Sequence, residues 1–385
     1  MQKKLIALAV ASATLASGAA MAQTNVQIYG SVDVGLSHRG DNIADDIGSK
    51  NSIDSGISSG NRLGFQGTED LGNGLKALFT LEAGFKVEDG EHTQGGRLFG
   101  RQAFLGLTGN FGTFIAGRLY TPHYSFLSAI DPFKGGTVGR YRNVFTAGVT
   151  TDGENLFDPT RVDNAVAYVS PSWSGFNVTL AFSNNAIGQE ATENAGDERV
   201  WAILPRYTNG PVDVGFSYHR IKTKDADDAT GGVGGTTDVN ITNWAVGGTY
   251  NFGSAKLHAF YDENKFKDIN AADDDLKLKS WLLGVTVPFG KHAIQASYTQ
   301  SKLSGFENHE GKARQWALGY TYAFSKRTNF YAAIADITNK DDRDGSDNHP
   351  VPVILSRIAA TAGDSTDSTG SGYQNGFQFG IKHTF

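Results

Sequence analysis

The sequence contains no cysteine, and its only two methionines are Met1 and Met21. Disulfide and thiolate chemistry are therefore excluded. After residue 22 the sequence has no run of about 18 apolar residues, so no membrane-spanning helix is predicted. Proline is scarce at 9 residues, whereas the chain has 48 glycines, 24 phenylalanines and 14 tyrosines. This composition favours many strands joined by tight turns, a property that a soluble β-sandwich shares with a barrel.

Residues 1–22 have the three regions of a cleaved secretory signal peptide. Lys3 and Lys4 precede an apolar stretch over 5–15, and Ala20-Met21-Ala22 is a small-residue cleavage site. We expect cleavage after residue 22 and export of 23–385 as a single domain. Loss of the two lysines changes the formal net charge from −6 to −8, which argues against a nucleic-acid-binding surface.

Segments of about ten residues alternate between apolar and polar side chains, the pattern of strands that face lipid on one side and a water-filled lumen on the other. In the last segment Phe377 and Ile381 share one face, while Gln378 and Lys382 share the other. The first segment, over 26–36, alternates in the same way, so we expect the first and last strands to pair and close the sheet. Further strands are predicted over 75–82, 176–183, 212–219, 244–252, 281–289, 294–298 and 316–324.

The connections alternate between short turns and long polar loops, which distinguishes a membrane barrel from a soluble sandwich. The long loops are predicted over 39–60, 119–160, 184–197, 221–240, 263–276 and 336–372. The sequence therefore predicts an all-β fold, a transmembrane antiparallel β-barrel of about 16 strands with short periplasmic turns and long external loops. Strands are also predicted over 97–108 and 113–118, where the alternation does not fix which side chains face inward.

Several stretches resemble the trimeric general-diffusion porins of Gram-negative outer membranes, particularly the beta-proteobacterial branch. These stretches are Val26–Gly30, Asn61–Gly72, Gly100–Leu107, Phe111–Thr113 and Gly117-Arg118. The resemblance implies a homotrimer in the outer membrane that contacts lipid and lipopolysaccharide. It also implies a third external loop that folds inward and narrows each pore.

Two further features gain a meaning from this resemblance. The loop over 119–160 is the longest connection, and Asp131–Gly136 within it resembles the tip of the family's constriction loop. The alternative is an ordinary long surface loop. The terminal Phe385 resembles the signal that the barrel-assembly machinery recognises.

Constrictions of this family set arginines on the barrel wall against acids on the inward loop, and the resulting field filters ions. The wall candidates are Arg62, Arg101, Arg118 and Arg161. The loop candidates are Asp131, Glu154 and Asp158. Strand phase alone predicts that Arg62 and Arg161 point inward, whereas Arg101 and Arg118 rest on the resemblance. The alternative for each arginine is a place at the rim, against lipopolysaccharide phosphate.

Other charged residues and motif matches give weaker evidence of a function. Lys76 and Glu82 share the inward face of one strand, where they tune conductance or form an ordinary wall ion pair. The nucleophile-elbow match over 56–60 lies in a Ser/Gly-rich loop without the required strand and helix. The acidic runs and histidines lack metal-ligand spacing. We therefore predict neither an enzyme, nor a cofactor, nor a metal site.

The predicted function is passive diffusion of small hydrophilic solutes and ions through the outer membrane, with a mild preference for anions. The preference follows from the excess of wall arginines, and the resemblance implies it too. Two alternatives remain. A substrate-specific channel or receptor needs a dense lumen site, for which Tyr29 and Tyr331 are the evident lumen-phase tyrosines. An outer-membrane enzyme needs Ser, His and an acid on one strand face, and the sequence shows no such set.

Overall fold

The structure is a computed structural model that describes residues 25–42, 48–145, 159–186, 198–223, 239–267, 276–306, 309–341 and 373–385. The predicted signal peptide, 1–22, lies outside the described residues, as do most of the predicted external loops. Within the described ranges, no helix is long and apolar enough to cross a membrane.

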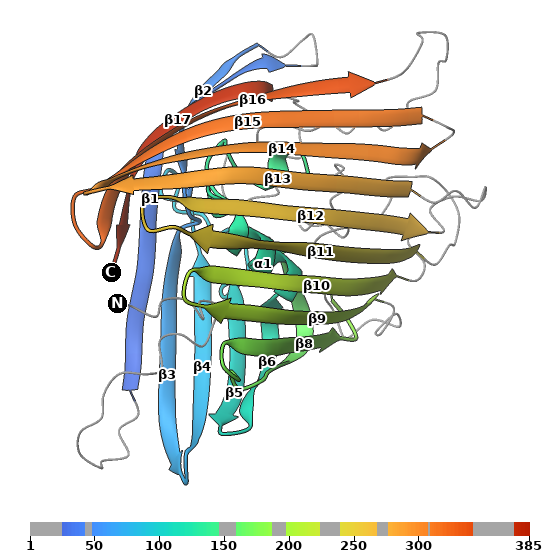
Figure 1. Cartoon of the computed structure of the whole chain (residues 1–385). Helices are drawn as coiled ribbons and strands as arrows, with labels where there is room; N and C mark the ends of the chain where they lie inside the picture. Colours follow the sequence, from blue (N-terminus) through green and yellow to red (C-terminus); the bar gives the residue numbers. More distant parts are fainter. Residues whose placement is uncertain are drawn as a thin grey trace.

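The described chain is almost entirely strand, joined by one short α-helix and one 3₁₀ turn (Figure 1). The strands of the first half are β1 (Asn25–Asn42), β2 (Lys50–Ser55), β3 (Arg62–Gly72), β4 (Leu75–Gly84), β5 (Gln102–Gly109), β6 (Gly112–Tyr120), β7 (Arg161–Val169) and β8 (Phe176–Ser183). Those of the second half are β9 (Glu198–Asn209), β10 (Val212–Thr223), β11 (Val239–Asn251), β12 (Lys256–Lys267), β13 (Leu276–Phe289), β14 (His292–Phe306), β15 (His309–Ala323), β16 (Thr328–Asp341) and β17 (Tyr373–Thr384). Between β6 and β7 lie α1 (Pro122–Ile130) and the 3₁₀ turn η1 (Tyr141–Asn143).

The sheet closes on itself with sixteen strand positions. On one edge of β1 the partner is β17, with Ser31 opposite Thr384. On the other edge β2 pairs with residues 34–39 of β1, and β3 pairs with residues 25–31. Strands β2 and β3 therefore share one position, broken over 56–61. All neighbours are antiparallel, so the predicted sixteen-stranded barrel and its closure are confirmed.

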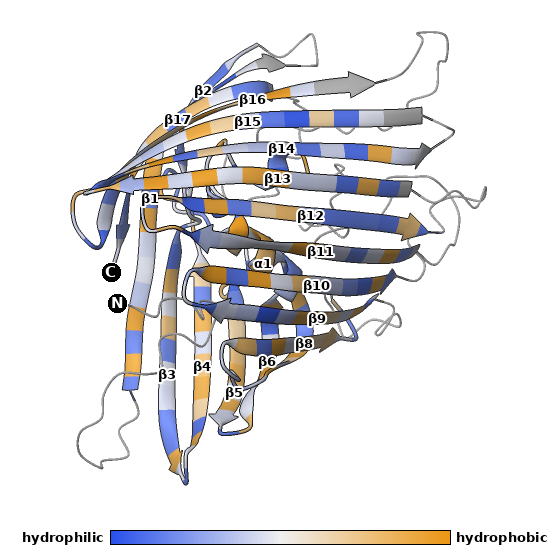
Figure 2. Ribbon diagram, viewed as in Figure 1, coloured by the Kyte–Doolittle hydropathy of each residue, from blue (hydrophilic) through white to orange (hydrophobic). Residues whose placement is uncertain are grey.

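The alternation read from the sequence is visible along the strands (Figure 2). In β1, Ile28 and Leu36 are exposed on the outside, whereas Asp33 and Ser37 are buried on the inside. The same phase holds in β17, where Phe377 is exposed and the neighbouring Gln378 is buried. Closure gives every described strand except β2 two hydrogen-bonded neighbours, which a strand surrounded by lipid requires.

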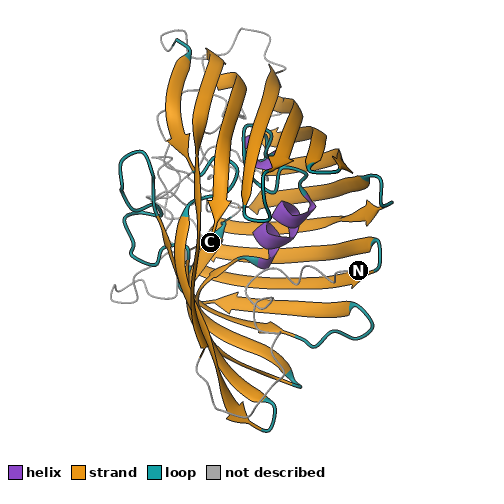
Figure 3. Cartoon of the chain, turned by 90° about the vertical axis from the view of Figure 1, so that its left-hand side faces the viewer, coloured by secondary structure: helices purple, strands orange, loops and turns teal. Residues whose placement is uncertain are grey.

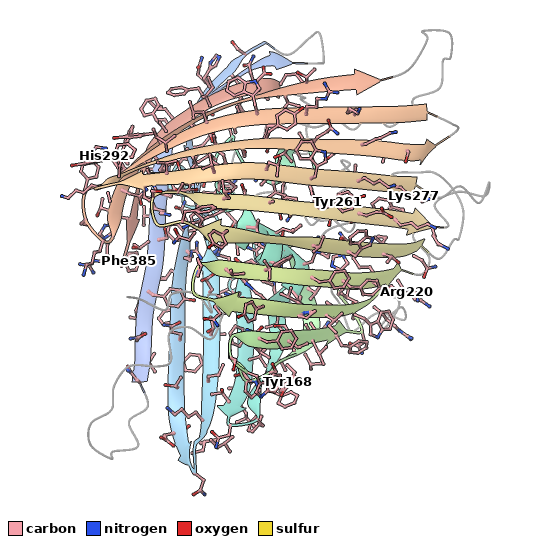
Figure 4. All side chains as sticks on the ribbon, viewed as in Figure 1. Tyr168, Arg220, Tyr261, Lys277, His292 and Phe385 are labelled. Carbon is pink, nitrogen blue, oxygen red and sulfur yellow. The ribbon has the colours of Figure 1, made fainter. Side chains whose placement is uncertain are left out.

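Strand ends carry aromatic and charged side chains (Figure 4). Tyr168, His292 and Phe385 lie where strands meet short turns or the chain terminus, while Arg220 and Lys277 lie near the opposite ends of their strands. Aromatic side chains at strand ends suit the interface between lipid and water.

Two predicted boundaries were wrong. The predicted loop over 39–60 contains the end of β1 and all of β2, because residues 34–39 of β1 pair with β2, whose Lys50 lies opposite Arg39. The predicted strand beginning near Arg97 starts at Gln102, and residues 85–101 form a further long connection between β4 and β5.

Candidate functional site

The segment after β6 lies against the inner wall of the barrel. It opens with α1, where the Thr121 hydroxyl oxygen accepts a hydrogen bond from the Tyr124 backbone N–H at 3.2 Å. Phe126 and Leu127 are completely buried, and α1 contacts β8 to β12. Figures 1 and 3 both show α1 within the curve of the strand wall.

Three glycines on the wall receive apolar side chains of this segment. The pairs are Gly215 with Phe126, Gly284 with Pro132 and Gly319 with Phe133. A Cβ atom on any of these glycines would overlap its partner. Leu283 and Leu318, adjacent to two of the glycines, are 57% and 48% exposed on the outside, so the glycines face inward. The glycines therefore let the loop approach the wall closely.

Polar contacts tie the same segment to β15. Gln315 Nε2 donates to the carbonyl oxygens of Gly139 and Arg140 at 3.1 and 3.2 Å. Asn143 Nδ2 donates to Gln315 Oε1 at 2.9 Å. These bonds satisfy backbone and side-chain groups that are buried between the loop and the wall.

The tip of the segment also reaches the break between β2 and β3. The Thr137 backbone N–H donates to the carbonyl oxygen of Ile57 at 2.6 Å. That break is held by Asp33, whose carboxylate accepts the backbone N–H groups of Ser58 and Ser59 at 2.7 and 2.8 Å. The segment thus contacts the wall at β15 and at the β2–β3 position.

A group of charged side chains, which we call the arginine cluster, lies beside this loop. At its centre Arg101 Nε donates to Glu82 Oε1 at 2.7 Å. Arg62 lies 3.9 Å from the other carboxylate oxygen of Glu82, which also accepts the Tyr29 hydroxyl at 3.0 Å. Glu82 is only 2% exposed, so its negative charge is compensated by these partners and not by water.

Arg161 joins the cluster through Arg101 and Tyr120. Its Nε donates to the carbonyl oxygen of Arg101 at 2.9 Å, and its Nη2 donates to the Tyr120 hydroxyl at 3.0 Å. Arg101 Nη2 donates to the same hydroxyl at 2.7 Å.

Arg118 joins the arginine cluster through Gly100, the residue before Arg101. Its Nε donates to the carbonyl oxygen of Gly100 at 2.7 Å, and its Nη1 lies 2.5 Å from Asp163. Arg97 pairs with the same carboxylate at 2.6 Å. Five arginines and two carboxylates leave the arginine cluster with a formal charge of +3. The four predicted arginines therefore lie together, although Asp163 offsets much of the charge of Arg118, which is 10% exposed against 44% for Arg97.

Asp131 lies elsewhere than expected. It is 1% exposed, and its carboxylate accepts backbone N–H groups of Phe133, Gly135 and Tyr141 at 3.1, 2.9 and 3.4 Å. Burial raises the pKa of Asp131 to about 6, although the hydrogen bonds oppose the shift. The carboxylate therefore organises the loop tip and does not face the pore.

The charges that the described part of this loop adds are basic. Lys134, three residues after the buried Asp131, is exposed at the tip, and Arg140 and Arg142 follow. Arg142 Nη1 donates to Thr160 Oγ1 at 2.7 Å, and its guanidinium lies over the Tyr124 ring at 5.3 Å. The other predicted acids, Glu154 and Asp158, lie outside the described residues.

Two further predicted residues, Lys76 and Phe385, lie outside the arginine cluster. Lys76 lies opposite Asp70 and Thr108, six residues from Glu82 along β4, so the two predicted lumen charges do not pair with each other. Phe385 lies on the outside beside Gly30 and closes the sheet.

Sequence reasoning missed three members or supports of the cluster. Asp163 lies two residues after Arg161, a spacing that places both on one face of a strand, and this signal was available. Tyr120 lies two residues after Arg118 in the same way. Arg97 belongs to the 85–101 connection, where no alternation exists to guide the assignment.

Comparison with known proteins identifies the family of this barrel. The family model described as Gram-negative porin matches residues 7–342. The chain belongs to this porin family. Outer membrane porin protein 32 of Delftia acidovorans is 34% identical over the whole of both chains. An outer membrane porin of Bordetella pertussis is 33% identical over 86% of this chain and 93% of its own.

Solved structures agree with the family. The anion-selective porin from Comamonas acidovorans superimposes with a TM-score of 0.74 at 28% identity, covering 94% of this chain and all of its own. OmpT of Vibrio cholerae, in a trimer form, gives a TM-score of 0.63 at 17% identity over 94% and 99% of the two chains, a likeness of fold alone. This porin therefore forms a passive diffusion channel in the Gram-negative outer membrane.

Proposed function

We propose that this porin passes small hydrophilic solutes and ions with a mild preference for anions. The observation that carries the proposal is the arginine cluster, with a formal charge of +3, beside a loop that adds Lys134, Arg140 and Arg142. A surplus of fixed positive charge where a pore narrows raises the local concentration of anions and repels cations. The name of the Comamonas relative supports the same sign.

The third loop supplies the narrowing in this proposal. Its described part leaves the wall at β6, packs along the inward glycines and reaches Ile57 on the β2–β3 position. A segment held at both places occupies part of the lumen cross-section. In the described part of the loop the exposed charge at the tip is basic, and the acids expected at Glu154 and Asp158 stay a prediction.

The porin is also proposed to assemble as a homotrimer, as the Vibrio cholerae relative does in one of its structures. Its proposed surroundings are outer-membrane lipid and lipopolysaccharide, and its proposed assembly uses the barrel-assembly machinery through the terminal Phe385.

We propose no catalysis. Ser217, His123 and Asp262 do meet between β10, α1 and β12, with His123 Nδ1 3.2 Å from Ser217 Oγ and His123 Nε2 3.1 Å from Asp262 Oδ1. Each of the three residues is 0% exposed, so no substrate reaches the serine. The three residues are better explained as an anchor that holds α1 to the wall.

The test is the zero-current potential of purified protein in planar bilayers under a KCl gradient. We expect anion preference in the wild type, and a smaller preference in Arg62→Gln and Arg161→Gln. Lys76→Gln is the matched control, because it removes a basic residue from β4 about 20 Å along the strand from Glu82. Cation preference in the wild type, or equal potentials in all four proteins, would overturn the proposal.

A further inference from the structure

Tyr120 lies at the end of β6 with its hydroxyl between two guanidinium groups. The hydroxyl oxygen accepts Arg101 Nη2 at 2.7 Å and Arg161 Nη2 at 3.0 Å. A hydroxyl oxygen has two lone pairs, so one tyrosine is able to accept both donors at once. The two arginines come from different parts of the chain, the 85–101 connection and the start of β7.

The ring of Tyr120 provides a second hold on Arg161. The Arg161 guanidinium lies over this ring, 4.6 Å from its centroid, and the Tyr124 ring stacks beside it at 5.6 Å between centroids. Arg161 also donates through Nε to the Arg101 carbonyl oxygen at 2.9 Å. A planar guanidinium suits this combination of stacking and directed hydrogen bonds, which an ammonium group does not reproduce.

Two guanidinium groups that share one acceptor repel each other and, if unrestrained, separate into water. Glu82 offsets part of this repulsion through its ion pair with Arg101, but the same carboxylate also pairs with Arg62. Tyr120 differs from Glu82 because it holds the arginines without cancelling their charge. An acidic side chain in its place would hold them equally well and remove one positive charge from the pore wall.

We propose that Tyr120 is a positioning residue for ion selectivity. Its hydroxyl and ring keep Arg101 and Arg161, which are 5% and 3% exposed, side by side at the inner wall, and the field of this pair sets much of the anion preference. The inference rests on the proposed function, because it assigns a cause to a preference that the arginine cluster is proposed to create.

The experiment compares Tyr120→Phe with Tyr124→Phe, each as full-length protein in planar bilayers. Tyr120→Phe keeps the ring and removes the shared acceptor. Tyr124→Phe removes a hydroxyl from the stacked neighbour, and that hydroxyl makes no hydrogen bond within the described residues. We expect the ratio of anion to cation permeability to fall about twofold in Tyr120→Phe and to stay at the wild-type value in Tyr124→Phe. Conductance at high salt should change little in either, since the pore width is unaltered.

A second variant covers the case in which Tyr120→Phe fails to fold. Arg161→Lys keeps the charge but loses the fork and the stacking plane. If position matters, Arg161→Lys lowers the permeability ratio; if charge alone matters, the ratio stays at the wild-type value and the inference is overturned. Wild-type ratios in both Tyr120→Phe and Arg161→Lys, alongside a lower ratio in Arg161→Gln, reject Tyr120 while the proposed function stands. No change in Arg161→Gln and Arg62→Gln instead rejects the proposed function.

Discussion

Gly30 and Phe385 exchange two backbone hydrogen bonds, Gly30 N–H to the Phe385 carbonyl at 3.0 Å and Phe385 N–H to the Gly30 carbonyl at 3.1 Å. The last residue of the chain is therefore hydrogen-bonded to the first strand. A Cβ atom on Gly30 would lie 2.6 Å from the Arg62 carbonyl oxygen and would also overlap the Phe385 ring. The seam of the barrel depends on the absence of a side chain at this position.

Replacing Gly30 with valine should weaken closure of the barrel. Overpacking of this kind costs about 1–3 kcal/mol, because the Arg62 backbone is unable to move away cheaply. The measurement is the folded fraction after refolding into lipid, read from the mobility difference between heated and unheated protein in gel electrophoresis. Gly48→Val is the control, since a Cβ there meets nothing within 4 Å. Equal folded fractions for the two variants would contradict the role of Gly30.

The fold was predictable because lipid on one side and water on the other impose a period of two along each strand. That constraint located the outward Ile28 and Phe377, and with them the pairing of the first and last strands. Residues 50–55 of β2 contain one apolar residue, Ile53, and show no such alternation, so they were read as loop. The constraint does not act on residues 85–101, so the start of β5 was misplaced.

The site was predictable only in part. Strand phase was enough for Arg62, which faces Glu82. It was not enough near Arg118, because the pairing of β6 with β7 shifts register between Gly117 and Leu119 and Asn164 has a positive φ of 49°. The position of Asp131 depends on how the loop folds on itself, which no strand periodicity encodes.

Enlarging a wall glycine should move the third loop. Gly284 accepts the Pro132 ring, so Gly284→Ala and Gly284→Leu should displace the loop toward the pore axis by increasing amounts. We expect single-channel conductance to fall in the order wild type, alanine, leucine, with more frequent current fluctuations in the leucine variant. The graded pair serves as its own control for nonspecific damage. Unchanged conductance in Gly284→Leu would show that the loop does not rest on this wall.

Asp131 should titrate near neutral pH. Because burial raises its pKa from 3.8 to about 6, the folded loop binds a proton more tightly than the unfolded chain does. The stabilising contribution of the protonated group is complete below pH 3.8 and is lost as the pH rises through about 6. The predicted readout is a protonated-carboxyl infrared band that disappears through this range in the wild type and is absent from the Asp131→Asn difference spectrum. A transition near pH 4 would contradict the buried placement.

Removing the acid at the centre of the arginine cluster should strengthen anion preference at the expense of stability. Glu82→Gln leaves Arg62 and Arg101 without their carboxylate and raises the formal charge of the cluster from +3 to +4. Breaking a buried pair costs about 3–5 kcal/mol, so the variant should unfold at a lower denaturant concentration. The zero-current potential should shift further in the anion-selective direction, because the arginine charges that remain are less compensated. Lower stability with an unchanged potential would mean that Glu82 and its arginines hold the wall together without acting on the passing ions.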